Sequence, residues 1–155
     1  MLAVVKKPHT EQTLFEVKGE IPSRVLNFLE EAFGQDVEVI EEDTEDTVEA
    51  IDSELLEDFT DLRGTKEVTI KMKYISFDIP KIIINIGTTV TWVNLEDAGH
   101  YINSDPHPGH NYYPEQNSSL LSKGDSYSLT FDMQGIYPYH CSAHYSTMQG
   151  MILVK

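Results

Sequence analysis

The stretch GIYPYHCSAHYSTMQGMILV, residues 135–154, decides how the rest of this chain is interpreted. It begins and ends with apolar segments of the length and composition of short strands, at 135–142 and 150–155. Between them lies Cys141, the only cysteine of the 155-residue chain. A single cysteine is most often a small buried hydrophobic residue. A second interpretation, a metal ligand, follows from the side chains around it: His140, His144, Met148 and Met151.

Further short strands are predicted upstream of this stretch. From Glu67 onward, apolar and polar side chains alternate with a period of two, as in a strand with one buried face. Trp92 is expected in the core between two sheets. Residues 105–119 form a long polar loop rich in turn formers. The expected strands are 67–77, 81–87, 88–94, 100–104, 126–131, 135–142 and 150–155. Seven short strands of this kind predict a mainly β protein, an antiparallel β-sandwich.

The first 65 residues have a different pattern, which predicts a small acidic α+β extension. The expected elements, from alternating and helical apolar spacing, are strands at 13–19 and 36–42 and helices at 22–34 and 47–59. The chain therefore divides into two expected domains, 1–65 and 66–155, with a boundary near residues 63–65. The extension contains no catalytic group of residues, and we predict that it mediates docking or dimerisation.

The chain is acidic, and the charge is concentrated near its start. The net charge is −15, and residues 1–66 carry 18 acidic against 6 basic side chains. Such a surface repels nucleic acid and anionic membranes, so neither is an expected partner, whereas a basic protein is. No apolar run approaches the roughly 18 residues that span a bilayer. Residues 1–12 lack the apolar segment of a secretory signal.

Cys141 and His144 have the spacing of two metal ligands on one loop. Cys141 ends a predicted strand and His144 falls in the following turn, so one short loop can direct both side chains to one point. That loop returns into the last strand with Met148 or Met151 at the same end. Loops of both sheets gather at the ends of a sandwich, so the distant His100 can complete the site. Two imidazoles, a thiolate and a weak thioether match the blue-copper arrangement, whereas structural zinc sites more often have four strong ligands.

Three features together resemble one family, the cupredoxins, and specifically plastocyanin-like and amicyanin-like copper domains. They are VTWVN at 90–94, the histidine six residues after Asn94, and the C-terminal pattern Y-x-C-x₂-H followed by Met, one residue and Gly. The resemblance covers about residues 67–155. It implies a Greek-key, cupredoxin-like sandwich with one copper per chain that cycles between Cu(II) and Cu(I). The implied ligands are His100, Cys141, His144 and, as the axial ligand, Met148.

Two residues beside the first ligand depart from the family pattern. Many cupredoxins have Asn directly after this histidine and Pro directly before it, whereas this chain has Tyr101 and Gly99. Residues next to the ligands tune affinity and potential. Met151 is the alternative axial ligand, although its place beside Ile152 suits the core of a strand better.

Three other histidines have less specific interpretations. His140 adjoins Cys141 in a predicted strand, so its side chain should point to the opposite face and be structural or partly exposed, and it is not expected to be a metal ligand. His107 and His110 lie on the long loop and are expected to be solvated, the alternative being a second, weaker metal or partner contact. Ser142 stands where multicopper oxidases have a second histidine, and binuclear copper centres need two cysteines. Both of these enzyme classes are therefore excluded.

The expected function is that of a mononuclear type 1 copper protein, not an enzyme, which carries single electrons between protein redox partners. Two alternatives stay open: a copper sensor or chaperone, and a copper enzyme with an open coordination position. The resemblance implies a periplasmic or other extracytoplasmic location, whereas the lack of a signal segment in residues 1–12 leaves the cytoplasm open.

Overall fold

The computed structural model describes residues 2–6, 13–18, 23, 27, 38–40 and 56–155. The chain forms two compact units, Met1–Asp58 and Phe59–Lys155. Within the described part of the chain, no helix has the length and apolar character needed to cross a membrane.

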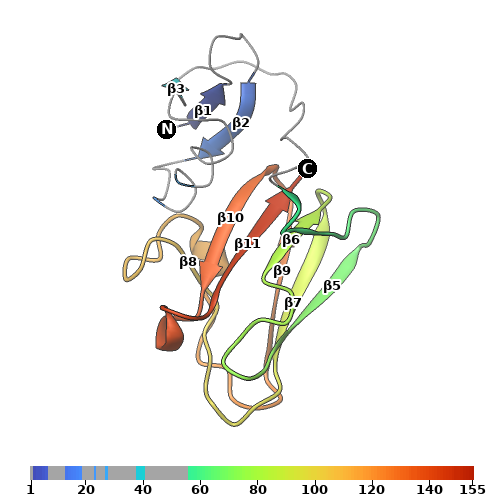
Figure 1. Ribbon diagram of the computed structural model, residues 1–155, viewed down its shortest axis with the longest axis vertical. Coiled ribbons are helices and arrows are strands. Elements are labelled where there is room, and N and C mark those ends of the chain that lie inside the picture. The colour runs from blue at the N-terminus through green and yellow to red at the C-terminus, as the bar shows by residue number, and fades with distance from the viewer. Residues whose placement is uncertain (1, 7–12, 19–22, 24–26, 28–37, 41–55) are drawn as a thin grey trace. The chain divides into compact units, whose positions relative to one another are not determined.

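The first unit contains an antiparallel sheet with the strand order β2-β1-β3 (Figure 1). The strands are β1 (Leu2–Lys6), β2 (Thr13–Lys18) and β3 (Glu38–Ile40). β2 and β3 lie within the strands predicted at 13–19 and 36–42, whereas β1 was not predicted. The two predicted helices fall largely outside the described residues. Of the first, only Ser23 and Asn27 are described, and both are helical; of the second, only 56–59 are described, and they form a turn.

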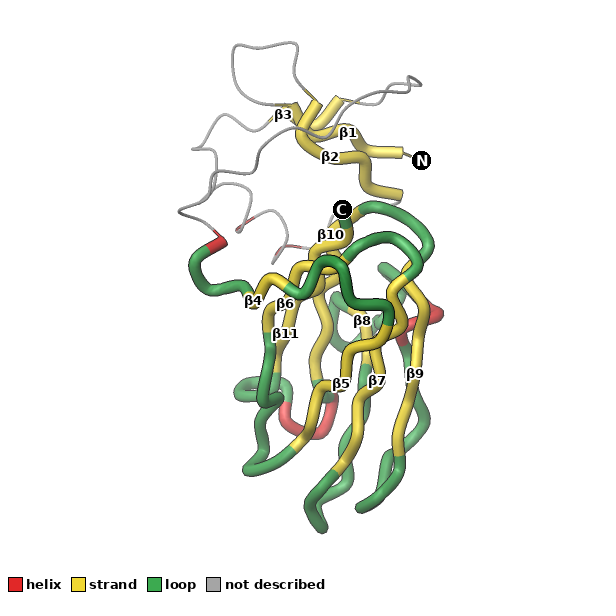
Figure 2. The backbone as a smooth tube through the Cα atoms, turned by 90° about the vertical axis from the view of Figure 1, so that its right-hand side faces the viewer, coloured by secondary structure: helices red, strands yellow, loops and turns green. Residues whose placement is uncertain are grey.

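The second unit is a β-sandwich of two sheets, which Figures 1 and 2 show from two sides. One sheet has the order β4-β6-β11-β10-β8, and the other has the order β5-β7-β9. The strands are β4 (Thr60–Asp61), β5 (Glu67–Met72), β6 (Lys81–Ile84), β7 (Thr88–Asn94), β8 (Asn103–Ser104), β9 (Ser126–Phe131), β10 (Gly135–His140) and β11 (Gln149–Val154). The mainly β sandwich is confirmed, and each of the seven predicted strands has a counterpart in β5 to β11. β4 precedes the predicted boundary at 63–65 and pairs with β6 of this unit.

The strand pairing is mixed rather than wholly antiparallel. β5 and β7 are parallel, as are β4 and β6 and also β6 and β11. β7 and β9, β10 and β11, and β8 and β10 are antiparallel. Parallel neighbours require a crossover connection. Here β6 comes between β5 and β7 in the sequence but belongs to the opposite sheet. The chain therefore crosses to the other sheet after β5 and crosses back before β7, which runs in the same direction as β5. Alternation of side chains predicts which face is buried but not this direction.

The first predicted strand of this unit, 67–77, is shorter than expected. β5 ends at Met72, and Tyr74 and Ile75 follow with positive φ angles of 60° and 54°. Tyr74, which continues the apolar alternation in the sequence, is 80% exposed. The backbone amides of Tyr74 and Ile75 donate to the carboxylate of Glu96, at 2.7 and 2.9 Å. These contacts with a distant residue stabilise a turn that the local pattern did not predict.

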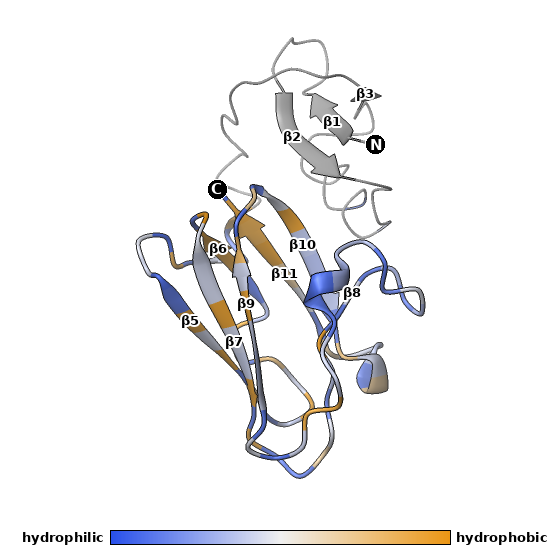
Figure 3. Ribbon diagram, turned by 180° about the vertical axis from the view of Figure 1, so that it is seen from behind, coloured by the Kyte–Doolittle hydropathy of each residue, from blue (hydrophilic) through white to orange (hydrophobic). Residues whose placement is uncertain are grey.

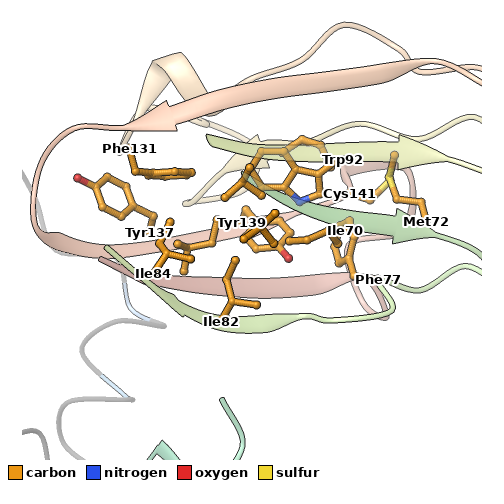
Figure 4. Packing of buried hydrophobic residues seen from close by; sticks show 14 of the residues in the cluster. Ile70, Met72, Phe77, Ile82, Ile84, Trp92, Phe131, Tyr137, Tyr139 and Cys141 are labelled. Atoms are coloured by element: carbon orange, nitrogen blue, oxygen red, sulfur yellow. The ribbon is translucent and has the colours of Figure 1, made fainter. Parts of the chain in front are cut away.

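Aromatic and branched side chains fill the space between the sheets. Tyr139 packs edge to face against Trp92 and Phe77, with ring centroids 5.3 and 4.8 Å apart. Figure 4 shows the cluster extending from Phe131 and Tyr137 at one end to Cys141 and Met72 at the other. β11 is apolar along most of its length (Figure 3), and its residues from Gly150 onward are buried. The predicted core position of Trp92 is confirmed, and the thiol lies at the end of the core.

Candidate metal centre

His100 is held at the end of the sandwich by the connection after β7. Its amide donates to the carbonyl of Leu121 (3.0 Å), and its carbonyl accepts from the amide of Leu121 (2.8 Å). The side-chain amide of Asn94 donates to the carbonyls of Ala98 (2.7 Å) and Leu121 (3.0 Å). The imidazole is fully buried. Its orientation is therefore set by the side chains that it contacts.

Cys141 and His144 belong to a short loop closed by backbone hydrogen bonds. Cys141 follows β10 directly, and a 3₁₀ turn, Ser142–His144, comes next. The amide of Cys141 donates to the carbonyl of Met148 (3.0 Å), and the amides of His144 and Met148 donate back to the carbonyls of Cys141 (3.0 Å) and His144 (2.9 Å). Both predicted ligands of this loop, and the backbone of Met148, are thereby fixed to one another.

The structure brings His100, Cys141 and His144 together, although 41 residues separate the first two in sequence. The sulfur of Cys141 lies 3.6 Å from Nδ1 of His100 and 3.5 Å from Nδ1 of His144. The three candidate donor atoms all lie within 4.8 Å of one another. A tetrahedral metal ion with metal–nitrogen distances of about 2.0–2.1 Å and a metal–sulfur distance of about 2.3 Å would place its nitrogen and sulfur ligands about 3.5 Å apart. The spacing and the soft donor set therefore fit a single copper ion.

The two candidate axial ligands are both buried. Met148 is fully buried, and its carbonyl is bonded to the amide of Cys141. Met151 is 5% exposed and lies within β11, where it pairs with Pro138 on one side and Lys81 on the other. Met148 is thus part of the loop that carries two of the candidate ligands, and Met151 is part of the sheet.

Glu96 orients His100. Its Oε1 atom lies 2.7 Å from Nε2 of His100, so Nε2–H donates to the carboxylate and Nδ1 faces the thiol with its lone pair. A carboxylate bonded to the outer nitrogen of a ligand histidine is a common arrangement at metal sites. Burial raises the pKa of Glu96, but hydrogen bonds from the Ile75 amide, the His100 ring and the Tyr74 amide outweigh it, so the net pKa is below the ordinary value. The carboxylate is ionised near neutral pH.

Two contacts connect the segment after His100 to the loop of Cys141, although Tyr101 stands where many cupredoxins have Asn. The amide of Tyr101 donates to the sulfur of Cys141 at 3.4 Å, a backbone contact that any residue can supply. The hydroxyl of Ser142 donates to the side-chain oxygen of Asn103 at 2.8 Å. This bond connects the segment after His100 to the loop of Cys141. The departure at Tyr101 therefore leaves the two segments connected.

His107, His110 and His140 form a second group. His140 is fully buried rather than partly exposed, and its Nδ1 lies 2.7 Å from the carboxylate of Asp105. His107 is exposed and His110 is half-buried, and both rings face His140. Burial lowers the pKa of His110, and the neighbouring His140 and His107 lower it further. The loop histidines are therefore in contact with one another and with His140, and are not simply solvated.

Sequence reasoning missed Glu96 and Asp105. Glu96 is four residues before His100, which is a weak local signal for a carboxylate beside a ligand. Asp105 is separated from His140 by 35 residues and has no such signal. Its partner is determined by the pairing of β8 with β10, where Asn103 lies opposite His140.

Comparison with known proteins finds sequence similarity to amicyanin and plastocyanin and structural similarity to amicyanin. Amicyanin from Paracoccus denitrificans is 34% identical over 85 residues, which are 55% of this chain and 60% of that protein. Plastocyanin from Scenedesmus fuscus is 34% identical over 98 residues, which are 57% of this chain and all of that protein. A solved structure of the Cu(I) form of an amicyanin variant has a TM-score of 0.50 and 26% identity, covering 59% of this chain and 85% of that one.

The fold is that of a cupredoxin domain. Residues 64–155 match the family of copper binding proteins described as the plastocyanin/azurin family, and the chain belongs to that family. Copper is the cofactor of this family, with one ion per chain as its norm, and amicyanin and plastocyanin are blue copper electron-transfer proteins.

Proposed function

We propose that this chain is a mononuclear type 1 copper protein that carries single electrons between protein redox partners. His100, Cys141 and His144 would hold the copper, with Met148 as the weak axial ligand. The observation that carries the proposal is the convergence of one thiol and two imidazole nitrogens at the end of a packed β-sandwich. Copper bound by these donors supplies a centre that gains and loses one electron.

The chain's own residues keep the site in one arrangement. Glu96 fixes the tautomer and orientation of His100, and the Tyr101 amide donates to the sulfur. Cys141 and Met148 are fully buried, which keeps water away from the sulfur donors. Binding requires the thiol to lose its proton and each histidine to present a lone pair. A site that is rigid without the metal needs little rearrangement when its charge changes.

His144 is the candidate ligand that a partner protein can approach. It is half-buried, whereas His100 and Cys141 are fully buried. The net charge of −15 supports a partner with a basic surface, because opposite charges accelerate encounter. The rate of electron exchange with such a partner should therefore fall as the salt concentration rises.

The test is a titration with Cu(II) followed by visible and EPR spectroscopy. An intense thiolate-to-copper band is expected in the wild-type protein and not in Cys141→Ser. The band should disappear on reduction and return on reoxidation. A wild-type protein that binds Cu(II) without this band, or one whose colour persists in Cys141→Ser, would contradict the proposed ligands. A band that cannot be cycled would contradict electron transfer.

A matched pair of substitutions tests the axial ligand. Met148→Leu and Met151→Leu both replace a buried methionine by a side chain of similar volume, so each should cost less than about 1.5 kcal/mol of stability. The axial ligand tunes the reduction potential. Met148→Leu is therefore expected to change the potential and the visible spectrum, and Met151→Leu to leave both unchanged. The reverse result would assign the axial position to Met151.

A further inference from the structure

His107, His110 and His140 direct one nitrogen each to a common point. Nδ1 of His107 lies 3.3 Å from Nε2 of His110 and 3.3 Å from Nε2 of His140. All three nitrogens lie within 4.8 Å of one another. A tetrahedral metal ion with metal–nitrogen distances of about 2.0–2.1 Å would place its nitrogens about 3.3 Å apart. Two of the three spacings in the cluster thus match those around a single ion.

Asp105 gives His140 the tautomer that a metal ligand needs. Its carboxylate lies 2.7 Å from Nδ1 of His140, and both side chains are nearly or fully buried. Nδ1–H donates to Asp105, so Nε2 has a lone pair directed toward His107 and His110. Glu96 makes the equivalent contact with His100 in the first site. A histidine bonded to a carboxylate through its outer nitrogen is typical of metal ligands.

The loop after β8 is held in the conformation that brings His110 to this point. His110 has a positive φ of 49°, which a residue with a side chain adopts rarely. Its amide donates to the carbonyl of Pro106 (2.8 Å), and its carbonyl accepts from the side-chain amide of Asn117 (2.7 Å). The ring of Tyr145 stacks on His107, with centroids 4.6 Å apart, and packs edge to face against His140 at 4.9 Å.

Several hydrogen bonds compete with a metal for this site, because Nδ1 of His107 lies within hydrogen-bond distance of both His110 and His140, and Nε2 of His110 also contacts Ser142. Oγ of Ser142 lies 3.0 Å from Nε2 of His110 and donates its own proton to Asn103. In the metal-free protein, Nε2–H of His110 can therefore donate to Ser142. Metal binding requires this proton to move to the other ring nitrogen, and a neutral imidazole can exist in either tautomer.

We propose that His107, His110 and His140 form a second metal site, which binds a divalent transition-metal ion through three imidazole nitrogens. Three imidazoles suit copper, zinc and nickel, and copper binds most tightly in this series. His140 is buried and His107 is exposed, so the three ligands leave a side of the ion open to solvent. Three protein ligands with an open position are the pattern of catalytic rather than structural metal sites. Because His140 and Cys141 are consecutive, a single peptide bond connects the two candidate sites.

The experiment is a Cu(II) titration of the full chain, with bound copper measured by equilibrium dialysis and the signals separated by EPR. The wild-type protein should bind two equivalents, and the second should give an EPR signal of nitrogen-coordinated copper without an intense visible band. His107→Ala should lose the second equivalent and retain the first. Asp105→Asn should weaken the second site about 10–100-fold, as the loss of an outer hydrogen-bond partner does. His9→Ala is the matched control, because it removes a histidine from the Met1–Asp58 unit.

The outcomes separate the two proposals. A second equivalent that persists with equal affinity in His107→Ala, or disappears in His9→Ala, would show binding elsewhere and overturn the second site. A wild-type protein that binds only one equivalent would also overturn it. If the blue band is missing but the nitrogen-coordinated signal is present and depends on His107, the first proposal fails and the second stands. Unchanged thermal unfolding of His107→Ala would show that any loss of copper is not a loss of fold.

Discussion

Replacing Glu96 by alanine removes three hydrogen bonds at once. The carboxylate accepts from the amides of Tyr74 (2.7 Å) and Ile75 (2.9 Å) and from Nε2 of His100 (2.7 Å). Hydrogen bonds to a charged group contribute about 1.5–3 kcal/mol each. Tyr74 is 80% exposed, so its amide can return to water at little cost. The donors of Ile75 and His100 are more buried, and their loss should lower the free energy of unfolding by about 3 kcal/mol.

Two further variants sharpen this prediction. Glu96→Gln keeps an oxygen in the position that accepts from Ile75 and His100, so its loss should be only about 1 kcal/mol. Asp97→Ala is the matched control. Asp97 is the next residue, and its ion pair with Lys123 is exposed, with 90% of the Asp97 side chain accessible. Exposed pairs contribute about 0–1 kcal/mol, so the control should unfold almost as the wild type does.

The assay is urea unfolding of the metal-free protein followed by fluorescence. Trp92 is the only tryptophan, and it lies in the core of the second unit, so its emission reports on that unit alone. Copper affinity, measured by competition with a chelator, should fall about 10–100-fold in Glu96→Ala because His100 loses its orientation. If Glu96→Ala unfolds like Asp97→Ala, the hydrogen bonds do not stabilise the fold. If it is destabilised but its copper affinity is unchanged, Glu96 does not position His100.

Three other substitutions test the fold. In Gly150→Ala, the new Cβ would overlap the ring of Tyr139. The free energy of unfolding in urea should therefore fall by about 1–3 kcal/mol. If the losses of Gly150→Ala and Tyr139→Leu are additive in the double variant, the clash does not exist. Ile70→Ala removes a fully buried side chain and should cost about 2–5 kcal/mol in the same assay, and a smaller loss would show that the core closes around the cavity. Asp61→Asn tests the pH dependence. The side-chain and then the backbone hydrogen bond with Arg63 lower the pKa of Asp61 from 3.8 to about 2. Because the folded pKa is the lower one, the stabilising effect is present above about pH 4 and is lost as the pH falls through 2. The wild type and Asp61→Asn should thus differ slightly at pH 7 and converge near pH 2, and a difference that grows in acid would contradict the sign.

The sequence predicted the strands best where burial alternates along them. β7 and β9 have the bounds predicted for them, 88–94 and 126–131. It failed at Tyr74, where the same alternation continues but the chain turns. The difference is physical, because the turn is stabilised by Glu96, which lies 22 positions after Tyr74 and 21 after Ile75. A local pattern contains no information about such a partner.

The candidate copper site could be predicted because its signal is largely local. Cys141, His144 and Met148 lie within eight residues on one loop, whose backbone hydrogen bonds fix their spacing. His100 required the additional inference that loops meet at the end of a sandwich, and the structure places it 3.6 Å from the thiol.

The sequence by itself therefore determined the strand pattern, the class of fold and the chemistry of the four candidate ligands. Only the tertiary structure decided the parallel pairing of β5 with β7, the contact of Glu96 with His100, and the grouping of His107 and His110 with His140. The physical reason is the distance in sequence. Strand direction depends on how the chain crosses between sheets, and the contact between His107 and His140 joins residues 33 positions apart. Neither depends on the periodicity or spacing of neighbouring residues.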